Sequence, residues 1–283
     1  MNDSRFFMLS GGGNDFVALA DPREDPQPAA VRALCQRGIS LGADGFFVVR
    51  PDEEGVRMDY WNADGNPSGL CLNGTRCAAR LAHQLGWCDE SFLVITGVGA
   101  IEATVLGKDS VRLDVPVPSR SPEAVEVSFG QDDDDAWSGW KIRIGVPHFV
   151  LHWPSSLADA PVESLGSALR WAPDFAPAGT NVNFVRFPSP HDLEIRTFER
   201  GVEAETLACG TGILASVALG IAQEIAKLPM RVKTLGGFPF EVGGEAADGR
   251  PTRWSLTGDA RLLAEGRLLP AALATPEPPE WTE

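Results

Sequence analysis

The sequence predicts an α+β fold of two pseudo-symmetric lobes, each a curved, mostly antiparallel sheet wrapped around a central helix. Two observations predict this fold. Short strand-like runs dominate both halves, and each half carries one long apolar run of helical type. The second half also repeats the first at an offset of 138 residues, both from Cys71 to Cys209 and from Thr96 to Thr234. Such a repeat favours an internal duplication, from which two lobes related by a pseudo-twofold axis follow.

The first half reads as short strands on either side of two helices. One helix is expected over 26–38, because Pro26 stands in its opening turn and Gly38 at its end. The other starts at the loop that carries Cys71 and runs to about Leu85, where Gly86 stops it. Strands are expected where apolar residues cluster or alternate with polar ones, over 6–9, 16–19, 46–49, 56–61, 92–96, 100–106 and 111–115.

The second half repeats this arrangement around a helix over about 209–225. Apolar residues lie nearly all round that helix, so we expect it inside its lobe: Ile213, Leu214, Val217, Ala218, Leu219 and Ile221. The run 261–269 either stays in the second lobe or crosses to complete the first.

The domain boundaries follow from the repeat and from composition. We place the first lobe at 1–118, a connecting segment at 119–139 and the second lobe at 140–270. The connecting segment contains four adjacent acids at 132–135, which cannot pack in a core. The tail is placed at 271–283, and its proline-rich run 275–280 is expected to be disordered.

Composition restricts the partners and the compartment. The chain has 283 residues and a formal charge of −15, which argues against nucleic acid and anionic membranes, because both need a basic footprint. There is neither a signal peptide nor a run of about 18 apolar residues, so we expect a cytoplasmic protein with no membrane span. Five cysteines with no CxxC pair and no zinc-like spacing fit a reducing compartment and no bound metal.

Two cysteines occupy equivalent positions in the repeat, each beside Gly and Thr where an apolar helix begins. At such a helix start the pKa of Cys71 or Cys209 is expected to be lowered, and the free N–H groups can bind a carboxylate. If both helices point into one pocket, one sulfur lies on each face of an amino acid Cα. One thiolate then removes the α-proton and the other thiol protonates the opposite face, which inverts the centre without metal or pyridoxal phosphate.

Two non-catalytic interpretations of these cysteines are also open. Each can be an inert core residue, and the two together can form a disulfide. Their equivalent positions favour the chemical interpretation. The other three, Cys35, Cys77 and Cys88, are expected to be structural.

Several motifs, in order along most of the chain, resemble the diaminopimelate epimerase family. They are Gly13-Asn14-Asp15-Phe16-Val17, Gly42-Ala43-Asp44-Gly45, Asn62-Ala63-Asp64-Gly65, Cys71 with Asn73-Gly74-Thr75-Arg76-Cys77, Gly179-Thr180-Asn181-Val182, Glu199-Arg200-Gly201 and Glu205-Thr206-Leu207-Ala208-Cys209-Gly210-Thr211-Gly212. The resemblance implies a cofactor-independent epimerase that interconverts LL- and meso-diaminopimelate, for lysine and peptidoglycan synthesis. It also implies that the substrate is a small amino acid and that the protein is a homodimer.

The resemblance assigns roles to individual residues. Cys71 and Cys209 match the catalytic pair, and His148 matches a histidine near the reacting centre. The positions expected to bind substrate are Asn14, Asn62, Asn73, Gly74, Asn181, Glu199 and Arg200, with the backbone amides of Gly210 and Thr211 holding the α-carboxylate. Chemically, Arg200 can clamp a distal carboxylate, and Asn62 and Asn181 offer neutral donors and acceptors.

This sequence departs from the family pattern at two positions. Val146 stands where the family usually has asparagine, and Leu72 where it usually has glycine. A related epimerase or racemase of another amino acid, such as histidine, is therefore an alternative. A non-catalytic ligand-binding or thiol-redox relative is a second one, of a different class.

Overall fold

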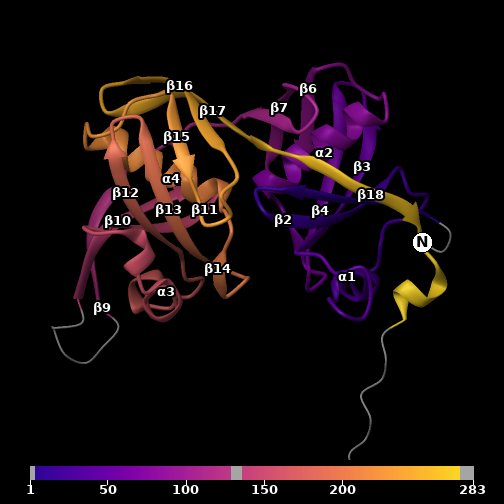
Figure 1. The fold of residues 1–283 in the computed structure, drawn as a ribbon, viewed down its shortest axis with the longest axis horizontal. Coiled ribbons are helices and arrows are strands. Elements are labelled where there is room, and N and C mark those ends of the chain that lie inside the picture. The colour runs from indigo at the N-terminus through magenta and orange to yellow at the C-terminus, as the bar shows by residue number, and fades with distance from the viewer. Residues whose placement is uncertain (1–3, 129–135, 275–283) are drawn as a thin grey trace, which may run out of the picture.

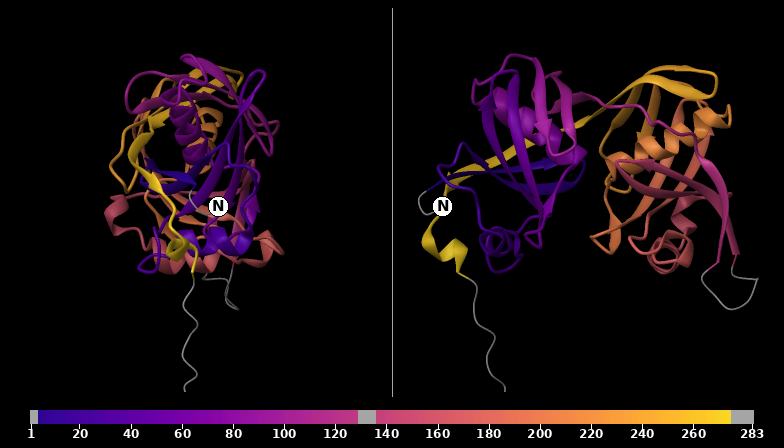
Figure 2. Two further views of the ribbon diagram at one scale, coloured as in Figure 1. Left: turned by 90° about the vertical axis from the view of Figure 1, so that its right-hand side faces the viewer. Right: turned by 180° about the vertical axis from the view of Figure 1, so that it is seen from behind.

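The computed structural model describes residues 4–128 and 136–274, which form two lobes side by side (Figures 1 and 2). The predicted acidic run lies outside the described residues, as does all but the start of the predicted tail. Four α-helices are found in the described ranges, and the rest of the regular structure is almost entirely strand. The predicted α+β class is confirmed.

The first lobe contains the elements up to β8. They are β1 (Arg5–Gly11), β2 (Asn14–Ala20), α1 (Pro28–Cys35), β3 (Gly45–Asp52), β4 (Gly55–Asn62), β5 (Pro67–Ser68), α2 (Leu72–Gln84), β6 (Ser91–Thr96), β7 (Gly99–Val105) and β8 (Ser110–Asp114). The strands pair in the order β1–β2–β3–β4–β6–β7–β8, and only β2–β3 and β4–β6 are parallel.

The second lobe repeats this order. Its elements are β9 (Glu123–Ser128), β10 (Ala136–Ile144), β11 (Val146–His152), η2 (Leu157–Asp159), α3 (Val162–Arg170), η3 (Pro173–Phe175), β12 (Asn181–Ser189), β13 (Asp192–Glu199), β14 (Ala204–Thr206), α4 (Gly210–Ala222), β15 (Met230–Lys233), β16 (Phe240–Ala247) and β17 (Arg250–Asp259). They pair as β10–β11–β12–β13–β15–β16–β17, with β11–β12 and β13–β15 parallel. The same order and the same two parallel pairs appear in both lobes, as a duplication requires.

The last strands tie the lobes together. The C-terminal part of β17 pairs with β8, so that Ser255 lies opposite Asp114. The chain then runs on as β18 (Arg261–Arg267) across the first lobe and pairs with β1, before the short helix η4 (Pro270–Leu273). Figure 1 shows this crossing as the yellow ribbon that joins the two lobes. Residues 261–267 therefore complete the sheet of the first lobe.

Each lobe holds one buried helix. In α2 the residues from Leu72 to Ala82 are buried, and in α4 nearly every residue is buried. Apolar side chains of both helices belong to one core cluster that extends through both lobes, so the starts of the helices are fixed relative to each other. These are the longest helices in the described ranges, with 13 residues each, and no helix there is long and apolar enough to span a membrane.

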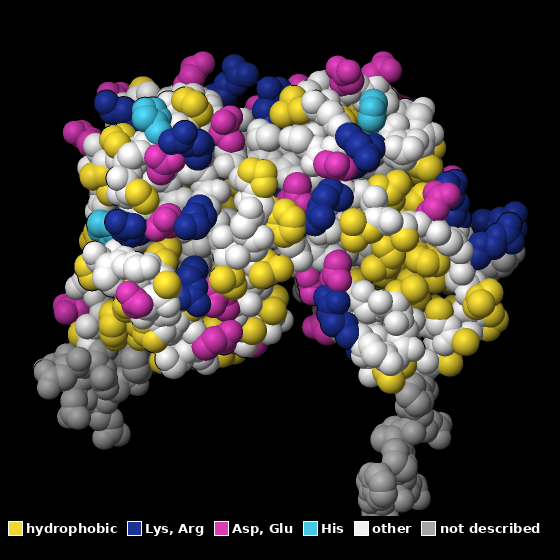
Figure 3. All heavy atoms as spheres, viewed as in Figure 1, with side chains coloured by type: hydrophobic (Ala, Val, Ile, Leu, Met, Phe, Trp, Pro, Cys, Tyr) yellow, Lys and Arg dark blue, Asp and Glu magenta, His cyan; other side chains and the backbone are white. Residues whose placement is uncertain are grey.

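The first helix is shorter than the sequence predicts. It spans Pro28–Cys35 and not 26–38, because the chain turns at Gln36, whose φ and ψ of −72° and 110° are extended. On the face shown in Figure 3, acidic and basic side chains are interspersed over both lobes, and apolar side chains gather over the first lobe.

Candidate active site

A cavity of about 480 Å³ opens between the lobes, with walls from both of them. The first lobe contributes the loop after β5 and the start of α2, and the second lobe contributes the end of β13 and the start of α4. The predicted site residues in its lining are Asn14, Asn62, Cys71, Asn73, Asn181, Glu199, Arg200, Cys209, Gly210 and Thr211. A second cavity of about 610 Å³ adjoins it and shares Asn14, Asn62, Cys71, Glu199 and Arg200.

The two cysteines hold equivalent positions in this cavity. Cys71 is the N-cap of α2, and its Sγ accepts a hydrogen bond from the Gly74 N–H at 3.4 Å. Cys209 is the N-cap of α4, and its Sγ lies 3.5 Å from the Thr211 hydroxyl. All five cysteines are free thiols. Two helix starts, one from each lobe, therefore bring a thiol and unpaired N–H groups to the same space.

The expected lowering of the thiol pKa values is wrong. Burial, together with the negative charge of Glu199, raises the pKa of Cys71 to about 11. Burial and Glu199 also raise the pKa of Cys209. The helix starts do act in the expected direction, through the N–H groups of Gly74 and Gly212, but burial outweighs them. Both thiols are accordingly protonated at neutral pH, and a neighbouring base has to generate the thiolate.

Glu199 lies at the end of β13 beside Cys209. Its Oε2 accepts a hydrogen bond from the Thr206 hydroxyl at 2.8 Å. Burial raises the pKa of Glu199, and hydrogen bonds from Thr206 and the Cys209 thiol oppose that rise. The Cys209 thiol is thus a hydrogen-bond partner of the Glu199 carboxyl, which is the arrangement that proton transfer between them needs.

Tyr60 is a site residue that the sequence did not identify. It lies on β4, lines both cavities, and its hydroxyl lowers the pKa of Cys71 as a hydrogen-bond partner. Gly45 leaves room for it, because a Cβ there would lie 2.6 Å from the Tyr60 hydroxyl oxygen. Alternation along β4 predicts that residue 60 faces inward, but not that the hydroxyl reaches a sulfur.

We expect Tyr60→Phe to raise the pKa of Cys71, because the variant loses a donor that favours the thiolate. The rate of alkylation of Cys71 by iodoacetamide should rise at a higher pH than in the wild type, while the profile of Cys209 stays unchanged. Turnover should fall about tenfold, since a hydrogen bond to a charged group contributes about 1.5 kcal/mol or more. Coincident Cys71 profiles in the two proteins would contradict this role of Tyr60.

Arg200 brings a cationic group to the wall of the cavity. Burial and the charges of Arg170 and Arg143 lower the pKa of Arg200, so this corner is cationic and suited to a carboxylate. Asn181 lines the cavity, but its carboxamide is held by the protein. Its Nδ2 donates to the Pro147 carbonyl at 3.1 Å, and its Oδ1 accepts from the Arg200 N–H at 2.8 Å.

Two predicted site residues lie behind the cavity wall. Gly74 contributes its N–H to Cys71, and a Cβ there would lie 3.0 Å from Met58 Cε. His148 is buried, and burial together with Arg200 lowers its pKa to about 3, so its ring is neutral. The Asn183 amide lies 3.2 Å from Nδ1 of His148, and Nε2 has no hydrogen-bond partner in the described part of the chain.

Asn183 was also missed by sequence reasoning. A Cβ at Gly212 would lie 2.4 Å from Asn183 Oδ1 and 3.3 Å from Cys209 Cβ, so the amide packs against the start of α4. His148 therefore contacts the residues at the start of α4 through Asn183, and it does not line either cavity. The only sequence signal for this is that Asn183 lies two residues after Asn181 on the same strand face.

The two departures from the family pattern lie in the cavity wall. Val146 and Leu72 both line it. Leu72 packs against Gly210, where a Cβ would lie 3.1 Å from Leu72 Cβ, so the two helix starts touch through this side chain. Among the described residues there is no group of three His, Cys, Asp or Glu side chains that could hold a metal ion.

The fold occurs in solved racemases and epimerases. A probable proline racemase from Agrobacterium radiobacter, with bound carbonate, matches with a TM-score of 0.73 and 14% identity over 97% of this chain and 96% of its own. A hydroxyproline epimerase from Agrobacterium vitis matches with a TM-score of 0.68 and 14% identity, covering 94% and 92%. At this identity the likeness concerns the fold alone.

More similar sequences define the family. The diaminopimelate epimerase family model matches residues 6–118 and 141–261. The diaminopimelate epimerase of Chlorobaculum tepidum is 36% identical over 92% of this chain and 99% of its own length, and that of Aquifex aeolicus is 35% identical over 93% and 97%. The chain belongs to the diaminopimelate epimerase family.

Proposed function

We propose that the chain interconverts LL- and meso-diaminopimelate by a two-base mechanism in which Cys71 and Cys209 act on opposite faces of one Cα. One observation carries the proposal: two thiols from equivalent helix starts of the two lobes line one cavity. The family of the chain supplies the substrate.

In this mechanism the substrate is held at both ends. The α-carboxylate accepts hydrogen bonds from the free N–H groups at the start of α4, at Gly210 and Thr211. The distal carboxylate lies at the cationic corner with Arg200, and the carboxamide of Asn62 contacts the distal polar groups. Negative charge that develops on the α-carbon and its carboxylate is stabilised by the same N–H groups.

One turnover passes protons among Cys209, Glu199, the substrate Cα and Cys71. The Cys209 thiol gives its proton to Glu199, and the resulting thiolate takes the α-hydrogen from one face. The Cys71 thiol, kept neutral by its raised pKa, protonates the other face. Cys71 then regains a proton and Glu199 loses one, which restores the starting state. The opposite stereoisomer reacts with the roles of the two sulfurs exchanged.

We also propose that the reaction needs neither pyridoxal phosphate nor a metal. Pyridoxal phosphate enzymes hold their cofactor on a lysine, and no described residue that lines either cavity is a lysine. The chemistry is thus assigned to side chains of the protein. Dialysis against a chelator and treatment with hydroxylamine should leave turnover unchanged. Loss of activity that pyridoxal phosphate or a metal salt restores would contradict the assignment.

The substrate is tested by a panel. The purified chain is incubated with LL-diaminopimelate and, separately, with single L-amino acids that include histidine, lysine and proline, and the products are separated by chiral chromatography. We expect meso-diaminopimelate from the first incubation and no inversion in the others. Conversion of another amino acid alone would overturn the substrate, and conversion of none would favour a non-catalytic relative.

One observation favours the second candidate, an epimerase of a different amino acid. Val146 presents an apolar side chain to the cavity where the family usually offers an amide. A substrate without a polar group near residue 146 would lose no hydrogen bond when valine replaces asparagine. Val146→Asn separates the two: it should leave LL-diaminopimelate turnover unchanged or improve it, and it should weaken turnover of a less polar substrate.

We propose further that the protein is a cytoplasmic homodimer. Apolar side chains that gather on the first lobe (Figure 3) support the association of two chains. Leu263 on β18 and Leu269 just after it are 54% and 66% exposed. Light scattering during gel filtration should give twice the chain mass of 30.3 kDa. A single-chain mass at micromolar concentration would contradict the dimer.

A further inference from the structure

A chain of polar contacts runs from the surface of the first lobe to the loop that carries Cys209. We propose that Asp44 is a positioning residue, which acts through Asn14 and Asn73 to hold the Cys209 loop at its distance from Cys71. The inference rests on the proposed two-thiol function, because it assigns a role in that reaction to Asp44, which is not in the lining of the cavity that holds both thiols.

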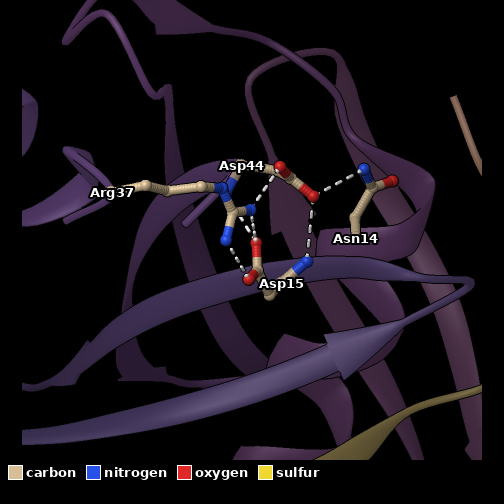
Figure 4. Close-up of polar contacts among 4 residues, drawn as sticks. All are labelled: Asn14, Asp15, Arg37 and Asp44. Carbon is tan, nitrogen blue, oxygen red and sulfur yellow. Dashed lines mark hydrogen bonds and ion pairs between the residues drawn. The ribbon is translucent and has the colours of Figure 1, made fainter. Parts of the chain in front are cut away.

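The series of polar contacts begins at the surface with an ion-pair cluster, shown in Figure 4. Arg37 donates through both terminal nitrogens to the Asp15 carboxylate, at 2.9 and 2.6 Å, and through Nη2 to Asp44 Oδ1 at 2.7 Å. The Asp44 N–H in turn donates to Asp15 Oδ1 at 2.8 Å. Although burial raises the pKa of Asp15, its bonds with Arg37 and Asp44 lower it overall, so the cluster stays charged. Asp44 is thereby fixed at the start of β3.

The second carboxylate oxygen of Asp44 is turned toward Asn14. Oδ2 accepts hydrogen bonds from Asn14 Nδ2 and from the Asp15 N–H, both at 3.1 Å (Figure 4). This contact decides which way the Asn14 amide points: the NH₂ group faces Asp44, and the oxygen faces α2. Asn14 Oδ1 then accepts from Asn73 Nδ2 at 2.7 Å. A flipped Asn14 would place two NH₂ groups against each other and break both contacts.

Asn73 extends the series of polar contacts to the second lobe. Its Oδ1 accepts from Arg76 Nη2 at 2.6 Å, which leaves Nδ2 to face both Asn14 and the carbonyl of Ala208, at 3.2 Å. Ala208 immediately precedes Cys209. Asn73 lies in the first turn of α2, two residues after Cys71. One carboxamide therefore spans from the helix of one thiol to the backbone beside the other.

The geometry gives Asp44 a specific effect on the reaction. If Asn14 is free to turn, Asn73 loses its alignment, and the Cys209 loop loses the hydrogen bond that the Ala208 carbonyl accepts from the first lobe. Proton transfer to one face of Cα then becomes slow relative to removal from the other. A displacement of about 1 Å at a reacting group can lower turnover by about 10²-fold, although the altered residue touches no substrate.

The test compares Asp44→Ala with two matched variants. Asp44→Asn keeps one side-chain oxygen for Asn14 and the Asp15 N–H. Asp59→Ala removes a carboxylate that accepts from Arg50 at 2.8 Å in the same lobe and whose side chain is similarly exposed, 42% against 39% for Asp44. Asp59 lies outside the lining of the cavity that holds both thiols.

We expect Asp44→Ala to lower kcat by about 10²-fold with little change in KM. In D₂O, the ratio of α-hydrogen exchange to inversion should rise for at least one isomer, because a carbanion that is not quenched on the far face is reprotonated on the near one. Asp44→Asn should stay within about threefold of the wild type, and Asp59→Ala should behave as the wild type. Equal losses in all three variants, or a wild-type ratio in Asp44→Ala, would overturn the proposal.

A second readout does not depend on activity. Diamide oxidises pairs of nearby thiols, and mass spectrometry of the digest gives the rate at which the Cys71–Cys209 peptide forms. Asp44→Ala should slow this reaction at least fivefold, and Asp44→Asn should not. If the wild type epimerises no diaminopimelate, the proposed function fails, but this rate still tests the positioning. Should Asp44→Ala not fold, Arg37→Met, at a residue whose side chain is 59% exposed, should slow the same reaction; an unchanged rate would overturn the proposal.

Discussion

Replacing either Cys71 or Cys209 by alanine is expected to lower kcat for diaminopimelate by at least about 10³-fold. Each sulfur serves one face of Cα, so neither can stand in for the other. Water reaching the vacated space is a far weaker acid or base at that position than a held thiol. Stopped assays with LL- and with meso-diaminopimelate measure the loss in both directions.

Control variants show whether a loss of activity comes from the missing thiol or from a folding defect. Cys88 is a partly buried thiol outside both cavities, and Cys88→Ala should keep full activity. Cys71→Ser and Cys209→Ser preserve the size of the side chain, and they should be almost as inactive as the alanine variants because a hydroxyl ionises far less readily than a thiol. Thermal unfolding of all variants should stay within a few degrees of the wild type. A single variant at either cysteine that keeps a tenth of wild-type turnover would refute the two-thiol mechanism.

Glu199→Gln is expected to lower kcat by about 10² to 10³-fold while making both thiols more acidic. The carboxylate of Glu199 raises the pKa of Cys71 and of Cys209, so its neutral replacement lowers both. Alkylation at a fixed pH should therefore become faster in the variant. Turnover nevertheless falls, because the amide cannot take the proton of Cys209.

The pH dependence of kcat/KM tests the same role of Glu199. Burial raises the pKa of Glu199 above its ordinary value of 4.5, and the group must be ionised to act as the base. The rate constant kcat/KM should consequently fall on the acid side with a midpoint above pH 4.5, and this limb should be absent in Glu199→Gln. Glu194→Gln, on the same strand but paired with Arg186, is the matched control. Slower alkylation together with wild-type turnover in Glu199→Gln would exclude this role.

The architecture could be predicted because it is repeated. The offset of 138 residues that Cys71 and Cys209 share with Thr96 and Thr234 predicts equivalent lobes, and both lobes have the same strand order around one buried helix. The path of β18 could not be predicted from local pattern. Its partner is β1, and Arg5 lies opposite Arg267 at the other end of the chain. Strand periodicity indicates which face is buried, but not which distant edge a strand completes.

The site could be predicted in composition but not in electrostatics. Motifs near the helix starts and strand ends identify the residues that line the cavity. The sign of the thiol pKa shift depends on how much protein covers each sulfur, and that coverage comes from the meeting of the two lobes. The contact of Tyr60 with Cys71 has the same origin, since it needs the space left by Gly45 on the neighbouring strand.

The most direct measurement of the central claim is the fate of hydrogen in the first moments of turnover. Wild-type enzyme and LL-diaminopimelate are mixed in D₂O and stopped before about a tenth has reacted, and both isomers are analysed by mass spectrometry. Two sulfurs on opposite faces should give meso-diaminopimelate with one deuterium and recovered LL-diaminopimelate with none. Product that keeps the original hydrogen, or equal labelling of both isomers, would show that one base serves both faces.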